Sequence, residues 1–142
     1  MDFIPETSNR QHLYDIAKAS LGEHLCGEQH LLGCALTVNA IFKSAFGSEI
    51  GGGASTIEMY SVLKNDNRFK PIDIPNYGDI IISPTGTGNG KIVGHVGIVG
   101  KYGIMSNDSK TGTLQEKYTQ LTWNNYYKNY GGIPTKFFRV IG

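Results

Sequence analysis

Apolar residues in the first half of the chain recur at helical spacing. Three such segments are present, and they predict helices from Asn9 to about Leu21, from Cys34 to Phe46, and between Ser55 and the turn at 65–67. Ser8 precedes the first segment and Ser55 opens the third, where short polar side chains cap helix N-termini. The first half is therefore expected to be helical.

The second half changes to short runs of β-branched residues separated by glycine. The runs predict strands at 79–83 and 92–99, a strand ending near Asn107, and a last strand at 136–141. Residues 85–90, Thr-Gly-Thr-Gly-Asn-Gly, fit a hairpin loop and miss the spacing of a phosphate-binding loop. We therefore expect an α+β fold in which helices pack on an antiparallel meander, in a single domain that spans all 142 residues.

An aromatic segment, Tyr118 to Tyr130, precedes the last predicted strand. The favoured interpretation is a helix that packs part of its aromatic side chains into the core. The alternative is a surface that stacks on sugars or lines a peptide groove. The four residues concerned are Trp123, Tyr126, Tyr127 and Tyr130.

Charge and hydropathy exclude some partners. The 13 basic and 12 acidic side chains give a net charge of +1 without clusters of either sign, so we do not expect nucleic acid to bind. The longest weakly polar stretch, Val93 to Met105, is too short to span a bilayer, so no membrane segment is expected. The N-terminal run Met-Asp-Phe-Ile-Pro-Glu-Thr-Ser-Asn-Arg lacks the pattern of a signal peptide. We therefore expect a protein made in the cytoplasm, acting as a monomer.

Cys34 lies at the expected start of the second helix, in the run Gly-Cys-Ala-Leu-Thr-Val-Asn. A free cysteine in such apolar surroundings is often only a packing residue. However, a helix N-terminus and a nearby imidazole both lower the pKa of a thiol, which creates a nucleophile. His95 is the best candidate for the imidazole, because it sits within the run Gly-His-Val-Gly-Ile-Val and shares a strand face with Gly97, which leaves room beside the ring. We expect the helix that carries Cys34 to press against this face.

A catalytic imidazole also needs a group that fixes its orientation. The strand after His95 ends in Asn107 and Asp108, and a tight hairpin would return both toward His95. An amide can accept a hydrogen bond without adding charge, which favours Asn107. Asp108 remains the competitor for this role.

The order of these elements resembles that of the papain-like NlpC-type and CHAP peptidoglycan hydrolases. The resemblance is carried by a helix beginning Gly-Cys-Ala-Leu-Thr, a strand entered by Tyr-Gly-Asp-Ile-Ile-Ile-Ser, and the strands Gly-His-Val-Gly-Ile-Val-Gly and Ile-Met-Ser-Asn-Asp-Ser. It covers roughly Cys34 to Asn107, and the chain looks most like small phage-encoded members. One departure concerns the oxyanion hole, because no tyrosine lies between Leu21 and Leu32, where many NlpC members carry one.

The resemblance implies a cysteine amidase or endopeptidase that cleaves amide bonds in cell-wall peptides. Cys34 matches the nucleophile, His95 the base and Asn107 the polar orienting residue. No metal or cofactor is required, and bacterial peptidoglycan peptides would be the partners. Such an enzyme would reach the wall after lysis or as part of a virion. The loops at 47–55 and 111–117 are expected to set specificity.

Two alternatives of other classes remain open. His24, Cys26, His30 and Cys34 are spaced so that a small binding module could hold zinc with them, the last three at helical spacing. Alternatively, the same scaffold could bind cell walls without catalysis. Metal analysis would test the first alternative, and an assay of fragment release would test the second.

Overall fold

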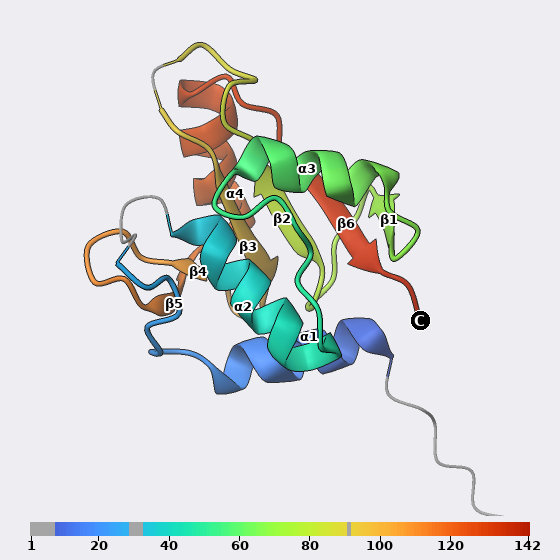
Figure 1. Cartoon of the computed structure of the whole chain (residues 1–142). Coiled ribbons are helices and arrows are strands. Elements are labelled where there is room, and N and C mark those ends of the chain that lie inside the picture. Colours follow the sequence, from blue (N-terminus) through green and yellow to red (C-terminus); the bar gives the residue numbers. More distant parts are fainter. Residues whose placement is uncertain (1–7, 29–32, 91) are drawn as a thin grey trace, which may run out of the picture.

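The computed structural model describes residues 8–28, 33–90 and 92–142. Three helices come first in the chain: α1 (Asn9–Ala19), α2 (Cys34–Phe46) and α3 (Thr56–Asn65). They pack against an antiparallel six-stranded sheet (Figure 1), which confirms the predicted α+β class. The strands are β1 (Phe69–Ile72), β2 (Ile80–Ser83), β3 (His95–Val99), β4 (Ile104–Asn107), β5 (Leu114–Tyr118) and β6 (Lys136–Val140).

The strand order is β1-β6-β2-β3-β4-β5, so β2, β3 and β4 are neighbours as the predicted meander requires. The last predicted strand, β6, does not follow β4 but inserts between β1 and β2. Two strands, β1 and β5, were not predicted from the sequence. Strand β5 occupies most of the segment expected to be a specificity loop. In the β3–β4 pair Gly97 lies opposite Ser106, which places His95 at the beginning of β3 near the end of β4.

Helix α2 begins where the apolar pattern begins. Its N-cap is Gly33, which offers no side chain to the first-turn amides, and Gly47 ends it with a φ of 86°. Its apolar side packs on the sheet face that carries Val96 and Ile98. We call the buried residues of this layer the α2 cluster; it includes Leu13, Ala17, Val38, Ile41, Phe42, Met59, Leu63, Ile80, Ile82, Val96, Ile98 and Met105.

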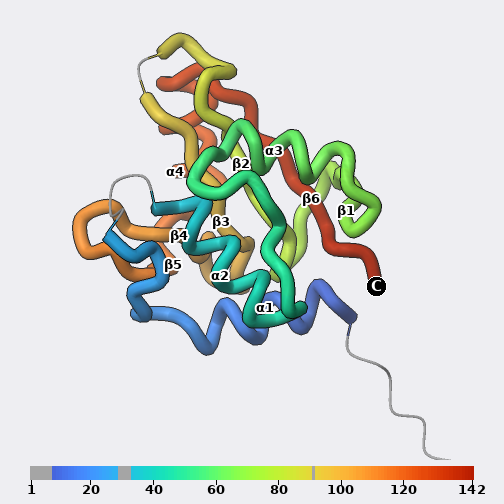
Figure 2. Tube along the Cα trace, in the orientation of Figure 1, coloured from blue at the N-terminus to red at the C-terminus, as the bar shows by residue number. Residues whose placement is uncertain are grey.

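The other face of the sheet is covered by the last helical segment of the chain (Figures 1 and 2), a short helix α4 (Gln120–Trp123) that continues into a π-helix, η1 (Asn124–Tyr130). Here Trp123 and Tyr127 pack on side chains that alternate with those of the α2 cluster along each strand. We call this group the Trp123 cluster; it contains Ile81, Val99, Ile104, Trp123 and Tyr127. The expected packing of the aromatic segment is thus found for these two aromatic residues, whereas Tyr126 and Tyr130 remain 43% and 53% exposed.

Asp79, in the Tyr-Gly-Asp entry to β2, has a structural role. Its fully buried carboxylate accepts two hydrogen bonds from Arg139 on β6, at 2.8 Å from Nε and 2.7 Å from the terminal nitrogen, and one from the amide of Asn76. Gly78 has a φ of 90°, and a Cβ there would lie 2.1 Å from the carbonyl oxygen of Arg10. This motif therefore fixes the start of β2 against β6 and α1.

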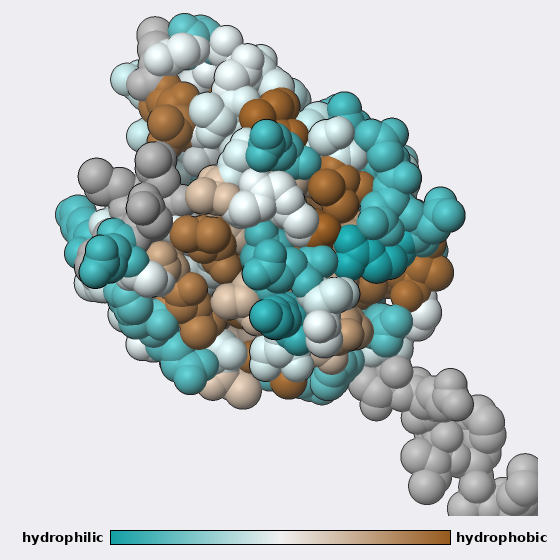
Figure 3. Space-filling model, in the orientation of Figure 1, coloured by the Kyte–Doolittle hydropathy of each residue, from teal (hydrophilic) through white to brown (hydrophobic). Residues whose placement is uncertain are grey.

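The surface mixes apolar and polar side chains. In the view of Figure 3, apolar patches are separated by polar residues across the face that bears α1 to α3. Among the described residues, no helix has the length and apolar character needed to cross a bilayer.

Candidate active site

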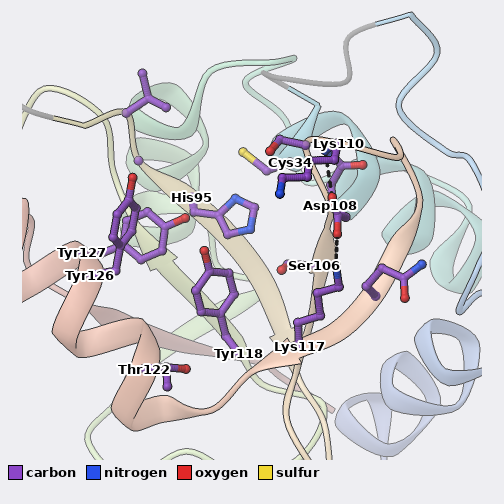
Figure 4. Close-up of a pocket in the computed structure, with 15 residues that line it drawn as sticks. Cys34, His95, Ser106, Asp108, Lys110, Lys117, Tyr118, Thr122, Tyr126 and Tyr127 are labelled. Atoms are coloured by element: carbon purple, nitrogen blue, oxygen red, sulfur yellow. Dashed lines mark hydrogen bonds and ion pairs between the residues drawn. The ribbon is translucent and has the colours of Figure 1, made fainter.

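A cavity of about 840 Å³ opens where the N-terminus of α2 meets the beginning of β3 and the end of β4. The three residues predicted from sequence, Cys34, His95 and Asn107, all line it. In Figure 4, the Cys34 sulfur and the His95 ring border the same open space. Further lining residues come from β4, β5, α4 and η1 and include Ser106, Gln115, Lys117, Tyr118, Thr122, Tyr126 and Tyr127.

Cys34 is the first residue of α2 and is 7% exposed. Burial raises the pKa of its thiol, and the backbone N–H groups of Val96, Ala35 and Cys34 itself lower it without cancelling the effect of burial. The expected lowering of this pKa by the helix N-terminus is therefore outweighed. In the resting protein the side chain is a thiol, held with its sulfur beside the N–H of Val96 on β3.

His95 is the first residue of β3, and only 8% of it is exposed. Burial lowers the pKa of its imidazole to about 4, because water no longer solvates the charged form. At neutral pH the ring is uncharged and can accept a proton. The resting pair is therefore a neutral thiol with a neutral imidazole, rather than a preformed thiolate and imidazolium.

The His95 ring is packed between aromatic side chains. It stacks on Trp123 with ring centroids 5.1 Å apart and an interplanar angle of 25°, and on Tyr127 at 5.7 Å and 18°. Tyr118 meets it edge-on at 6.1 Å. Within the part of the chain that the structure describes, no hydrogen bond to the His95 ring is formed.

The prediction that α2 presses on the His95 face of β3 is wrong. Val96 and Ile98 contact the α2 cluster, whereas Val99, on the face shared with His95, belongs to the Trp123 cluster. Cys34 and His95 still line one cavity, because His95 lies at the very beginning of the strand, where both faces border the same opening.

The end of β4 supplies the polar residues near the pair. Ser106 lies opposite Gly97 and so shares the face of His95, while Asn107 alternates to the face of Met105, a member of the α2 cluster, as is Cys34. Both residues are buried and line the cavity. The register therefore puts Asn107 nearer the sulfur side of the cavity than the ring side.

Asp108, the competitor for the orienting role, is engaged in the β4–β5 turn. Its carboxylate accepts a hydrogen bond from the amide of Lys110 at 2.8 Å and pairs with the ammonium group of Lys117. The hydrogen bond from Lys117 is the main cause that lowers the pKa of Asp108. This engagement makes Asp108 the weaker candidate for orienting His95.

The aromatic environment of His95 was not predicted from sequence. The sequence predicted that a helix packs Trp123, Tyr126, Tyr127 and Tyr130 partly into the core, but no spacing rule relates a helix near residue 125 to a strand near residue 95. The available signal was the density of aromatic residues in the segment from 118 to 130. It suggested a functional surface but did not indicate that this segment contacts His95.

The structure does not support the helical spacing on which the zinc alternative is based. The helix begins at Cys34, so helical spacing does not relate Cys26 to Cys34, and these residues line different pockets. The Cys26 sulfur lies 3.4 Å from the carbonyl oxygen of Gly112. His30 lies outside the described residues, and among those described no cluster of three or more candidate ligands could hold a metal.

Comparisons with known proteins support the fold. No protein-family model matches the chain, and no curated protein sequence matches it. Among solved structures, the chain is similar to one from the crystal structure of the type VI native effector–immunity complex Tae3–Tai3 from Ralstonia pickettii. The TM-score is 0.60 at 16% sequence identity, and the alignment covers 94% of this chain and 99% of that chain. At this level of identity, the likeness establishes a shared fold over nearly the whole chain.

Proposed function

We propose that the protein is a cysteine hydrolase that cleaves amide bonds in bacterial peptidoglycan. The observation that carries this proposal is the meeting of Cys34, at the N-terminus of a helix, with His95, at the start of a strand, on one cavity of about 840 Å³. A thiol beside a neutral imidazole in a cavity that opens to solvent is the arrangement that nucleophilic catalysis of acyl transfer requires.

The neutral resting pair implies a particular order of proton transfer. As the sulfur attacks the carbonyl carbon of the bound peptide, its proton moves to the His95 ring, so thiolate develops only during attack. The backbone N–H of Cys34 is placed to donate to the carbonyl oxygen as it gains negative charge. His95 then donates its proton to the nitrogen of the leaving amine, the C–N bond breaks, and an acyl-enzyme remains. Water, deprotonated by His95, releases the acyl group and restores the thiol.

Asn107 is the polar residue that we propose as the third member of this site. It is buried, lines the cavity and lies on the sulfur side, where an amide can contact the Cys34 side chain or the substrate. We expect Asn107→Ala to lower kcat without a large loss of stability. Asp108→Ala should instead act on the β4–β5 turn, because its carboxylate is already held by Lys117 and by turn amides.

The proposed substrate class rests on the sequence resemblance, because the residues around Cys34, His95 and Asn107 follow the order seen in NlpC-type and CHAP peptidoglycan hydrolases. The fold shared with one chain of a type VI effector–immunity complex is consistent with this proposal. We propose that this enzyme also acts on walls outside the cell that makes it, after lysis, as part of a virion or after injection. Because the structural neighbour is one chain of an effector–immunity complex, a protein that covers the cavity is a partner to test.

The test is release of peptides or free amines from purified cell walls, read by mass spectrometry. Cys34→Ser should abolish release while thermal stability stays close to that of the wild type. Cys26→Ser is the matched control, because Cys26 is equally buried but lies outside this cavity, and it should retain activity. Full turnover by Cys34→Ser would overturn the proposal, and equal loss in both variants would revive the zinc alternative.

A second candidate function is binding without catalysis. Tyr126, which lines the cavity, stacks on Tyr130 at 5.8 Å and 19°, and both residues remain partly exposed, as an aromatic surface for sugars would be. A binding domain would sediment with purified walls and release nothing. The same wall assay therefore separates the two functions.

A further inference from the structure

We propose that the packing of Trp123 and Tyr127 positions the His95 ring, in place of a hydrogen-bonded carboxylate or amide. The inference concerns how the proposed catalytic base is held, so its catalytic readout rests on the proposed function. Trp123 and Tyr127 are positioning residues in this view, because they act through His95.

The ring contacts of His95 have a regular geometry. Both Trp123 and Tyr127 lie nearly parallel to the imidazole, at 25° and 18°, with centroids within 6 Å. Tyr118 meets the same ring edge-on, at 62°. Parallel contacts restrict tilting of the ring, and the edge contact restricts its sliding. Three aromatic neighbours therefore define the plane of an imidazole to which no described residue gives a hydrogen bond.

Trp123 is itself held in one orientation. It is fully buried, and its indole N–H donates to the Ser83 hydroxyl on β2 at 2.9 Å. The Ser83 hydroxyl also lies 3.3 Å from that of Thr135. Since an indole N–H in the core strongly requires an acceptor, this bond selects one orientation of the indole. Ser83 lies opposite His95 in the β2–β3 pair, so the anchor and the ring that it positions are cross-strand neighbours.

The stacked rings also bear on the positive charge that His95 gains during the proposed reaction. Burial disfavours imidazolium at rest, as the pKa of about 4 indicates. Aromatic faces attract a cation, so the stacked rings offer the developing imidazolium partial compensation for its lost hydration. The ring can thus accept the thiol proton transiently without a neighbouring carboxylate.

The experiment combines NMR of the histidine rings with wall-release kinetics in the full chain. Trp123→Leu removes the stacked ring, and Trp123→Phe keeps an aromatic face without the indole N–H. In Trp123→Leu we expect the His95 ring protons to lose their ring-current shift and kcat to fall by up to roughly 100-fold with little change in KM. Trp123→Phe should recover most of kcat. Assignment of the His95 signals comes from a His95→Gln spectrum.

The control is Leu121→Ala, which alters a 69% exposed residue on the same helix and should change none of these quantities. Tyr127→Leu provides a second, independent removal of a stacked ring should Trp123→Leu fail to fold. Unchanged His95 shifts and kcat in a folded variant lacking either ring would overturn the inference. If the wild type releases nothing from walls, the proposed function fails, while the NMR measurements still decide whether the aromatic rings hold His95.

Discussion

The face of the sheet under α2 buries mostly aliphatic side chains, whereas the face under α4 and η1 is centred on Trp123 and Tyr127. Both faces reach the cavity at the beginning of β3. The first delivers Cys34 on a helix N-terminus, and the second surrounds His95 with rings. Cys34 therefore comes from the helix layer, and His95 comes from the sheet, where its ring packs against the α4 and η1 side. This division predicts that substitutions in the two layers will affect stability and catalysis differently.

The largest effect on stability is expected at Asp79, which belongs to the motif of the sequence resemblance but lies away from the cavity. Asp79→Ala leaves the Arg139 guanidinium and the Asn76 amide without their buried acceptor. We expect the free energy of unfolding to fall by roughly 4 kcal/mol, measured by urea titration, while kcat per folded molecule is retained. Lys18→Ala, which removes a surface ion pair with Glu116, should change stability little. A folded but inactive Asp79 variant would show that the motif aspartate serves catalysis.

A matched pair of isoleucines tests the division between layers more directly. Ile98 and Ile104 lie on neighbouring strands, are 0% and 1% exposed, and belong to the α2 cluster and the Trp123 cluster respectively. Substitution of either by alanine should cost about 3 kcal/mol of unfolding free energy. Only Ile104→Ala should also lower kcat, because it loosens the packing around Trp123. Equal retention of kcat in both variants would contradict a special role for the Trp123 cluster.

The pH dependence of stability reports the burial of His95. Its folded-state pKa of about 4 lies below the unfolded value near 6.5, so the unfolded chain binds the proton more readily between these pH values. This contribution to stability is complete above pH 6.5, is lost as pH falls toward 4, and amounts to roughly 3 kcal/mol. Chemical denaturation at several pH values should show this slope in the wild type and a much smaller one in His95→Gln.

The pH dependence of activity follows from the same group. If neutral His95 is the base, kcat/KM should stay high well below pH 6 and fall only as pH approaches 4. If kcat/KM were half-maximal near pH 6.5, the His95 ring would be hydrated in the working enzyme. That result would contradict tight packing of aromatic side chains around it.

The helices and strands that carry the site could be predicted from the sequence more readily than the faces on which they pack. Cys34, His95 and Asn107 could be related because each belongs to a segment with clear periodicity, and the structure brings all three to one cavity. Which face of β3 meets α2 was not predictable, because both faces of the run His-Val-Gly-Ile-Val are buried and alternation alone does not assign them. A strand buried on both sides carries no polar face to mark the solvent side.

The missed strands have a similar physical cause. Strand β1 contains Pro71, which is unusual in a sheet and is tolerated here because β1 lies at the edge. Strand β5 reads Leu-Gln-Glu-Lys-Tyr, a polar run that gains its order from pairing with β4 rather than from its own propensity. The aromatic contacts of His95 likewise join residues that are far apart in the sequence, so they could not be predicted from local patterns.

The smallest effect is expected where sequence and structure agree most simply, at the N-terminus of α1. Ser8 caps this helix by accepting a hydrogen bond from the amide of Gln11 at 3.1 Å, while the Gln11 side chain bonds to Asp15 instead of returning to the cap. Ser8→Ala should therefore cost about 1 kcal/mol of unfolding free energy, the usual value for one cap, and leave kcat and the His95 signals unchanged. Gln11→Ala should cost less, because a full capping box is not formed. An effect of Ser8→Ala on kcat would mean that α1 is coupled to the cavity through the α2 cluster, and that the two layers are less independent than their packing indicates.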